Sequence, residues 1–324
     1  MRRPDPFNAL PLPALFRRLC STGLVRRLLE IARDEDFGVS PPEAAGHGGV
    51  PTGGSGDVTS DCCIPCDRMG AGRVIARAGG VVSGFEAMPL LVEVFAPACR
   101  HDVHARDGAR VEPGTVVATI HGPLDELLGL ERTLLNLVGR LSGIATRTSE
   151  FVGAIPPGSR ARLYDTRKTT PGLRALEKYA VRCGGGCSHR MGLHDGMLIK
   201  DNHLTGVGVR DLPAFVTRAA ELARRNAEPT FVEVEVDTLD QYEALLTLPA
   251  GVVDIVLLDN MTCEQMRAAA GRRDTVRPEL ELEASGGVTL AKMPEIAATG
   301  VDRISVGGLT HSAVSLDVAL DVDG

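Results

Sequence analysis

Residues 230–260 read TFVEVEVDTLDQYEALLTLPAGVVDIVLLDN, which is a β-type run, a helical stretch and a second β-type run. The same alternation continues on both sides of this stretch. β-Type runs occur at 162–165, 197–199, 230–236, 252–258, 279–284 and 302–306, and helical stretches follow at 172–184, 211–226, 238–247, 262–272, 289–299 and 312–320. Six successive strand–helix units predict a parallel sheet or barrel.

Two features favour an α/β barrel over other parallel-sheet folds. The first strand is not followed by the Gly-x-Gly-x-x-Gly turn of dinucleotide-binding folds. Acidic residues also alternate with aliphatic ones along two strands, namely Glu233, Glu235 and Asp237, and then Glu279, Glu281 and Glu283, which Ser285 follows. Because carboxylates on a dry face cost free energy, we expect this face to line a wet lumen, and an edge strand is the alternative.

The chain before residue 160 has a different pattern. We expect an amphipathic helix at 14–35, a Gly- and Pro-rich loop from Gly38 to Gly56, a β-rich region at 72–122 and a long helix at 125–152. The length predicts two domains, 1–128 and 129–324, with the option that a C-terminal helix returns to the first.

The composition limits the classes of partner and compartment. The formal net charge is −7, which argues against nucleic acid or anionic membrane as a partner. The sequence has neither a run of about 18 apolar residues nor a signal-peptide pattern, so we expect a cytoplasmic protein. We expect its eight cysteines to be free thiols. The alternative is zinc at Cys62, Cys63 and Cys66, or at Cys183, Cys187 and His189.

Lysine is rare, and its placement is informative. The chain has 31 arginines and only four lysines, and three of these lie within residues 168–200. A compact ammonium and a planar guanidinium bind anions differently. We therefore expect Lys168 and Lys200, which adjoin predicted strand ends, to bind anions, and Lys178 to lie on a solvated helix face.

Along the chain, the carboxyl ends of the predicted strands carry first cations, then carboxylates and finally glycine turns. In βα barrels the active site lies at these ends. In chain order the ends read Thr166-Arg167-Lys168-Thr169, Lys200-Asp201-Asn202-His203, Asp237, Asp259-Asn260, Ser285-Gly286-Gly287 and Gly307-Gly308-Leu309. Glycine turns bind phosphate through backbone N–H groups, carboxylates hold ribose hydroxyls or Mg²⁺, and the cations neutralise pyrophosphate or carboxylates. This set predicts an enzyme that acts on a phosphosugar and a second anion.

At these residues the chain resembles the quinolinate phosphoribosyltransferase family. The matching stretches are GDVTS (56–60), ERTLLNLVGRLSGIAT (131–146), DTRKTTPGLRALEKYAVRCGGG (165–186), SHRMGLHDGMLIKDNH (188–203), VEVEV (232–236), LLDNM (257–261), LEASGGV (282–288) and ISVGGLTHS (304–312). The resemblance implies an α/β fold with an N-terminal open-faced α/β sandwich and an incomplete, TIM-like barrel of about six to seven strands, in a homodimer or higher oligomer. It also implies the transfer of phosphoribosyl to quinolinate with decarboxylation, in NAD biosynthesis, with Mg²⁺ as cofactor.

The resemblance also implies a role for each matched residue. Arg132 from the partner, Arg167, His189, Arg190 and Lys200 would bind quinolinate. Phosphoribosyl pyrophosphate would meet Lys168, Asp201, His203, Glu235, Asp259, Ser285, Gly286, Gly307 and Gly308. The catalytic residues would be Lys168, Lys200, Glu235 and Asp259, with Glu235 and Asp259 also in the Mg²⁺ shell.

The chain departs from the family pattern at three places, which are the Gly/Pro-rich stretch at about 39–53, the pair Cys187-Ser188 and a small insertion around 248–251. None of these removes a charged site residue. Two alternatives stay open, a ModD-like paralogue of uncertain substrate and a non-catalytic binding protein on the same scaffold.

Overall fold

The structure is a computed structural model that describes residues 7–38 and 56–323. The predicted Gly- and Pro-rich insertion at 39–53 lies outside the described residues. The described chain forms two compact units. The barrel unit contains residues 7–9, 148–169 and 186–311, and the second unit contains the remainder.

The barrel unit is built on one parallel six-stranded sheet. Its strands, in spatial order, are β6 (Arg162–Tyr164), β11 (Arg303–Ser305), β10 (Glu281–Ser285), β9 (Ile255–Asp259), β8 (Val232–Val236) and β7 (Met197–Ile199). Although β6 and β7 are consecutive along the chain, they lie at opposite edges of the sheet. The barrel is therefore incomplete, and the predicted α/β fold class is confirmed.

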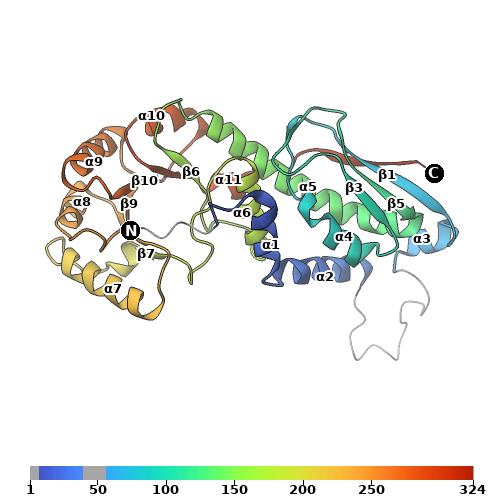
Figure 1. Cartoon of the computed structure of the whole chain (residues 1–324), viewed down its shortest axis with the longest axis horizontal. Helices are drawn as coiled ribbons and strands as arrows, with labels where there is room; N and C mark the ends of the chain where they lie inside the picture. The colour runs from blue at the N-terminus through green and yellow to red at the C-terminus, as the bar shows by residue number, and fades with distance from the viewer. Residues whose placement is uncertain (1–6, 39–55, 324) are drawn as a thin grey trace. The chain divides into compact units, whose positions relative to one another are not determined.

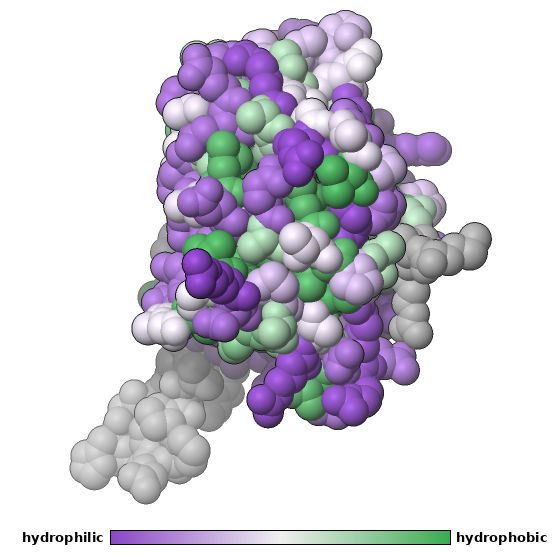
Figure 2. All heavy atoms as spheres, turned by 90° about the vertical axis from the view of Figure 1, so that its left-hand side faces the viewer, coloured by the Kyte–Doolittle hydropathy of each residue, from purple (hydrophilic) through white to green (hydrophobic). Residues whose placement is uncertain are grey.

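Helices follow the strands of this sheet, and most of them lie along its outer side (Figure 1). They are α7 (Leu212–Asn226), α8 (Leu239–Leu246), α9 (Cys263–Val276), α10 (Met293–Ala297) and α11 (Gly308–His311), with short 3₁₀ turns η2 (Asp201–His203) and η3 (Leu290–Lys292). Thr238 and Thr262 each begin a helix by accepting a backbone N–H from a glutamine three residues later, which is a capping box. Figure 2 shows the outer face of this unit, where hydrophilic side chains surround scattered apolar ones, as expected of helices with one face in water.

The second unit contains an antiparallel sheet in the order β12 (Val318–Asp323), β1 (Met69–Ala76), β5 (Val116–Pro123) and β3 (Arg100–Val103). A small ribbon pairs β2 (Gly80–Val81) with β4 (Arg110–Val111). Its helical segments are α1 (Leu12–Cys20), α2 (Leu24–Phe37), α3 (Val58–Cys63), η1 (Phe85–Ala87), α4 (Met88–Phe95), α6 (Arg174–Cys183) and most of α5 (Leu124–Gly153). The last of these agrees with the long helix predicted at 125–152.

Three local predictions are wrong. The helix predicted at 14–35 is divided into α1 and α2 at Gly23, whose φ of 75° is left-handed and favours glycine. The helix predicted at 312–320 is absent from the described chain, because residues 318–323 form β12 and pair with β1. Lys178 is not on a solvated face, since it is only 1% exposed.

No helix in the described ranges 7–38 and 56–323 is long and apolar enough to cross a membrane. The eight cysteines are free thiols, of which Cys62, Cys63 and Cys66 are exposed and Cys99, Cys183 and Cys187 are buried.

Candidate active site

A cation and several carboxylates meet at the carboxyl ends of β7, β8 and β9. Lys200 follows β7, and its Nζ donates to Oε2 of Glu235 at 2.5 Å. Burial raises the pKa of Glu235, Lys200 opposes this rise, and the nearby Asp259 and Asp201 add to it. The predicted residues Lys200, Asp201, Glu235 and Asp259 therefore lie close enough to act on one ligand.

The turn after β10 is hydrogen-bonded to the end of β9. Gly286 has a φ of 88°, and a Cβ there would lie 2.1 Å from Oδ1 of Asn260. Asn260 also adopts a left-handed φ of 53°, donates its side-chain N–H to Asp259 Oδ2 at 2.7 Å, and donates its backbone N–H to Ser285 O at 2.9 Å. Only glycine fits at 286, and Asn260 joins the carboxylate Asp259 to the predicted phosphate turn.

The second glycine turn, after β11, packs on the loop that carries Lys168. The Lys168 Cδ lies 2.8 Å from where a Cβ on Gly307 would stand, and Thr310 Oγ1 donates to the Lys168 carbonyl at 2.7 Å. His311 is also at this turn, with its Nε2 3.4 Å from the same Cβ position. Sequence reasoning missed His311, although its place four residues after Gly307 on a short helix could have indicated it.

Two predicted guanidinium groups lie near each other. Burial lowers the pKa of Arg190, and the positive charge of Arg167 lowers it further. Arg190 is 8% exposed, and its Nη1 donates to the Gly196 carbonyl at 3.0 Å. Glu233 and Asp195 oppose the lowering of its pKa. Two neighbouring guanidinium groups can bind an anion with more than one negative charge.

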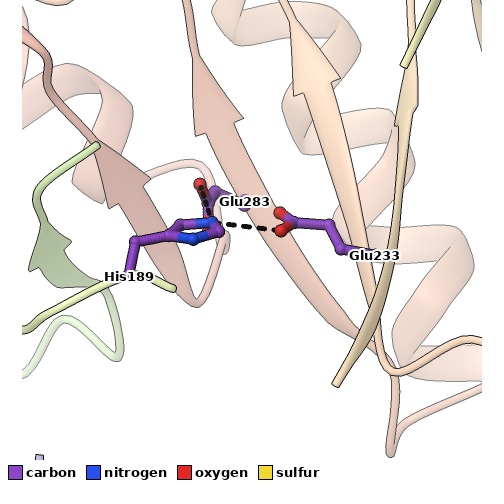
Figure 3. Close-up of side chains that lie close together, drawn as sticks. All are labelled: His189, Glu233 and Glu283. Atoms are coloured by element: carbon purple, nitrogen blue, oxygen red, sulfur yellow. Dashed lines mark ion pairs between the residues drawn. The ribbon is translucent and has the colours of Figure 1, made fainter. Parts of the chain in front are cut away.

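His189 lies between two buried carboxylates (Figure 3). Its Nε2 is 3.0 Å from Glu233 Oε2 and 3.4 Å from Glu283 Oε1, and both acids are fully buried. Burial alone would lower the pKa of His189, but Glu283 and Glu233 together raise it to about 9. The two carboxylates therefore favour the imidazolium form, whereas the Arg190 backbone N–H, 2.8 Å from Nδ1, favours the neutral ring.

Arg303 completes this group, and sequence reasoning missed it. Its Nε is 2.7 Å from Glu283 Oε2, and its guanidinium lies 3.8 Å from the centre of the Tyr164 ring. An arginine at the start of a short, otherwise apolar strand was the available signal. Two cations thus balance two carboxylates, so the prediction of a wet lumen is wrong at Glu233 and Glu283, where the face is dry.

The same three side chains also have the spacing of metal ligands. His189, Glu233 and Glu283 offer ligand atoms within 4.8 Å of one another, and they are the one such group of three among the described residues. Because His189 and Arg303 already neutralise both carboxylates, ion pairs account for the arrangement. The cysteines suggested as the zinc alternative do not form such a group within the described chain.

Three other predicted site residues are exposed to solvent. Asp237 is exposed at the end of β8. His203 is also exposed, and its Nδ1 accepts the Lys200 backbone N–H at 2.9 Å. Arg132 lies on α5 in the second unit, with 68% of its side chain exposed and Glu131 3.6 Å away.

An incomplete barrel with glycine turns, paired carboxylates and several cations at its strand ends defines a class of transferase that acts on phosphosugars. Comparison with known proteins identifies the family within this class. The C-terminal domain of quinolinate phosphoribosyl transferase matches residues 144–321, and the N-terminal domain of the same family matches residues 57–142. The chain therefore belongs to the quinolinate phosphoribosyltransferase family, and the resemblance read from its motifs is confirmed.

Individual relatives agree with this assignment. A nicotinate-nucleotide pyrophosphorylase (carboxylating) of Mycobacterium leprae is 43% identical over 82% of this chain and 91% of its own length. A probable enzyme of the same name from Bacillus subtilis is 38% identical over 83% and 89%. The solved structure of the nicotinate-nucleotide pyrophosphorylase from Francisella tularensis superposes with a TM-score of 0.78 at 30% identity and covers 99% of this chain and all of that one. The chain is accordingly a phosphoribosyltransferase enzyme.

Proposed function

We propose that the chain transfers the phosphoribosyl group of phosphoribosyl pyrophosphate to quinolinate, releasing pyrophosphate and carbon dioxide and forming nicotinate mononucleotide. Two observations support this most directly. Arg190 lies near Arg167, and Lys200 contacts Glu235 close to Asp259 and Asp201 at the carboxyl ends of β7, β8 and β9. A ring with two adjacent carboxylates needs several cations, and a phosphosugar needs the carboxylates and glycine turns.

The proposal divides the site between the two substrates. Arg167, Arg190 and Lys200 would bind the carboxylates of quinolinate. His189, whose charge is balanced by Glu233 and Glu283, would form the wall beside Arg190. Glu235 and Asp259 would accept hydrogen bonds from the ribose hydroxyls. The 5′-phosphate would lie on the N–H groups of two turns, at Ser285 and Gly286 and at Gly307 and Gly308. Lys168, Asp201 and His203 would lie toward the pyrophosphate.

In the reaction, the pyridine nitrogen forms a bond to C1 of the ribose as the C1–oxygen bond breaks, and pyrophosphate leaves with the bonding electrons. Positive charge that develops on the sugar is stabilised by the carboxylate of Glu235. Quaternising the nitrogen makes the ring an electron sink. The bond to the 2-carboxylate then breaks, carbon dioxide leaves, and a proton from solvent is added at that carbon. No side chain acts as a nucleophile.

The donor set at Glu235 and Asp259 fits Mg²⁺. Both offer carboxylate oxygens, which this ion prefers, and the repulsion between them, together with Asp201, would be relieved by a divalent cation. Magnesium bound there would neutralise charge on the pyrophosphate. Its binding by these two residues is part of the proposal.

We also propose that the enzyme is a homodimer in which Arg132 of one subunit reaches the quinolinate site of the other. The exposure of Arg132 and its position in the ERTLLNL motif support this. A cytoplasmic location belongs to the same proposal.

The experiment is an assay of the purified protein with quinolinate, phosphoribosyl pyrophosphate and Mg²⁺, followed by mass spectrometry for nicotinate mononucleotide. Product is expected with quinolinate and not when nicotinate replaces it, because nicotinate lacks the second carboxylate. A protein that binds quinolinate without turnover would support the non-catalytic alternative. A protein that neither binds nor converts quinolinate would favour the ModD-like alternative.

A further inference from the structure

The short segment that leads into Arg190 is held by its backbone. Cys187 donates its N–H to Leu163 O at 2.7 Å and accepts the N–H of Asp165 at 3.1 Å, which joins it to the end of β6. His189 donates its backbone N–H to Asp165 Oδ1 at 2.8 Å. The residue between them, Ser188, is 4% exposed and needs partners for its own N–H and C=O groups, because unpaired buried backbone groups are costly.

Those partners come from a residue 180 positions earlier in the sequence. Asn8 accepts the Ser188 N–H at its Oδ1, at 2.7 Å, and donates from its Nδ2 to the Ser188 carbonyl, at 2.8 Å. One side-chain amide therefore satisfies both backbone groups of a single residue, as a neighbouring β-strand would. Asn8 lies with the barrel unit, two residues before Leu10, where the second unit begins.

We propose that Asn8 is a positioning residue of the acid-binding site, so that the N-terminal segment completes the wall carrying His189 and Arg190. The inference rests on the proposed function, because the substrate affected is quinolinate. Asn8 acts through the backbone of Ser188 and does not touch the substrate. The glycine turns and carboxylates assigned to phosphoribosyl pyrophosphate lie on other strands, so their geometry does not depend on it.

The test is the replacement Asn8→Ala, with Asn226→Ala as a matched control at an exposed asparagine on α7. Loss of two neutral hydrogen bonds is expected to raise KM for quinolinate about five- to thirtyfold. KM for phosphoribosyl pyrophosphate and the melting temperature should stay near those of the unchanged protein. Asn8→Asp should be at least as harmful, because one carboxylate oxygen would face the Ser188 carbonyl. Asn226→Ala should change none of these quantities.

A second measurement does not depend on catalysis. Hydrogen exchange of the peptide containing residues 187–190 should become faster in Asn8→Ala and stay unchanged in Asn226→Ala. If exchange is faster in Asn8→Ala but the protein does not convert quinolinate, the contact between Asn8 and Ser188 is supported and only the proposed reaction is refuted. Unchanged exchange together with an unchanged KM for quinolinate would overturn the role of Asn8, and so would an equal rise in both KM values.

Discussion

Arg190 carries a guanidinium that is nearly buried and lies close to a second one, Arg167. We predict that Arg190→Ala lowers kcat/KM for quinolinate by about a hundred- to a thousandfold, the range expected when a buried ion of a bound complex loses its partner. Arg190→Lys should recover only part of this, because an ammonium cannot form the bidentate contact. Steady-state kinetics measure it, with the exposed Arg210→Ala as control. An unchanged kcat/KM in Arg190→Ala would remove Arg190 from the site.

Two substitutions at Asn260 can separate the effect of its backbone conformation from the effect of its side-chain hydrogen bond. Its φ of 53° costs an ordinary L-residue about 1 kcal/mol but costs glycine little. We therefore predict that Asn260→Ala unfolds with a free energy about 1 kcal/mol lower than Asn260→Gly, as measured by urea denaturation. Both variants lose the hydrogen bond to Asp259 and should raise KM for phosphoribosyl pyrophosphate alike. Equal stability of the two variants would contradict the backbone part of this argument.

Among the strands, a buried cluster of charged side chains connects β8, β10 and β11. His189 has a pKa of about 9 in the folded chain, above its ordinary 6.5, so its stabilising effect is complete below pH 6.5 and is lost as the pH rises toward 9. His189 and Arg303 lower the pKa of Glu283 to about 2 against the opposing effect of burial, so its contribution is present above about pH 4.5 and is lost toward pH 2.

From these directions we predict that the free energy of unfolding falls between pH 6.5 and 9, and that this fall is smaller in His189→Gln, which has no ionisable ring. Denaturation curves at a series of pH values measure it. Comparing the two proteins removes the contribution of other groups that titrate in the same range. Equal slopes in both proteins would mean that the carboxylates do not hold the ring as an imidazolium.

Sequence reasoning succeeded for elements whose pattern is local. The strands β8 and β9 and the helix between them were predicted because VEVEV and IVLL are buried runs and Thr238 begins a capped helix. It failed where the partner is distant. The alternation of Val318, Leu320 and Val322 is typical of a strand, but its partner β1 lies about 250 residues earlier, so the segment was assigned to a helix.

The same limit applies to the site. The residues at strand ends could be predicted because parallel strands bring their carboxyl ends to one edge of a sheet. The ion pairs of His189 could not, because Glu233 and Glu283 come from strands separated by β9 and are 50 residues apart in sequence. A pattern of alternating acids indicated a lumen face, but only the sheet order shows that Arg303 lies opposite Glu283 and keeps that face dry.

At the scale of the whole molecule, the proposed homodimer requires each active site to combine residues of two chains. Within one chain, Arg132 belongs to one compact unit and Arg190 to the other. We predict that Arg132→Ala and Lys200→Ala are each nearly inactive and that mixing them restores activity. Random exchange of subunits makes half of the dimers hybrids with one intact site of two, so about a quarter of wild-type activity should return. Each variant incubated alone is the control. Mixtures that stay inactive although subunits exchange would show that Arg132 does not act across a dimer interface.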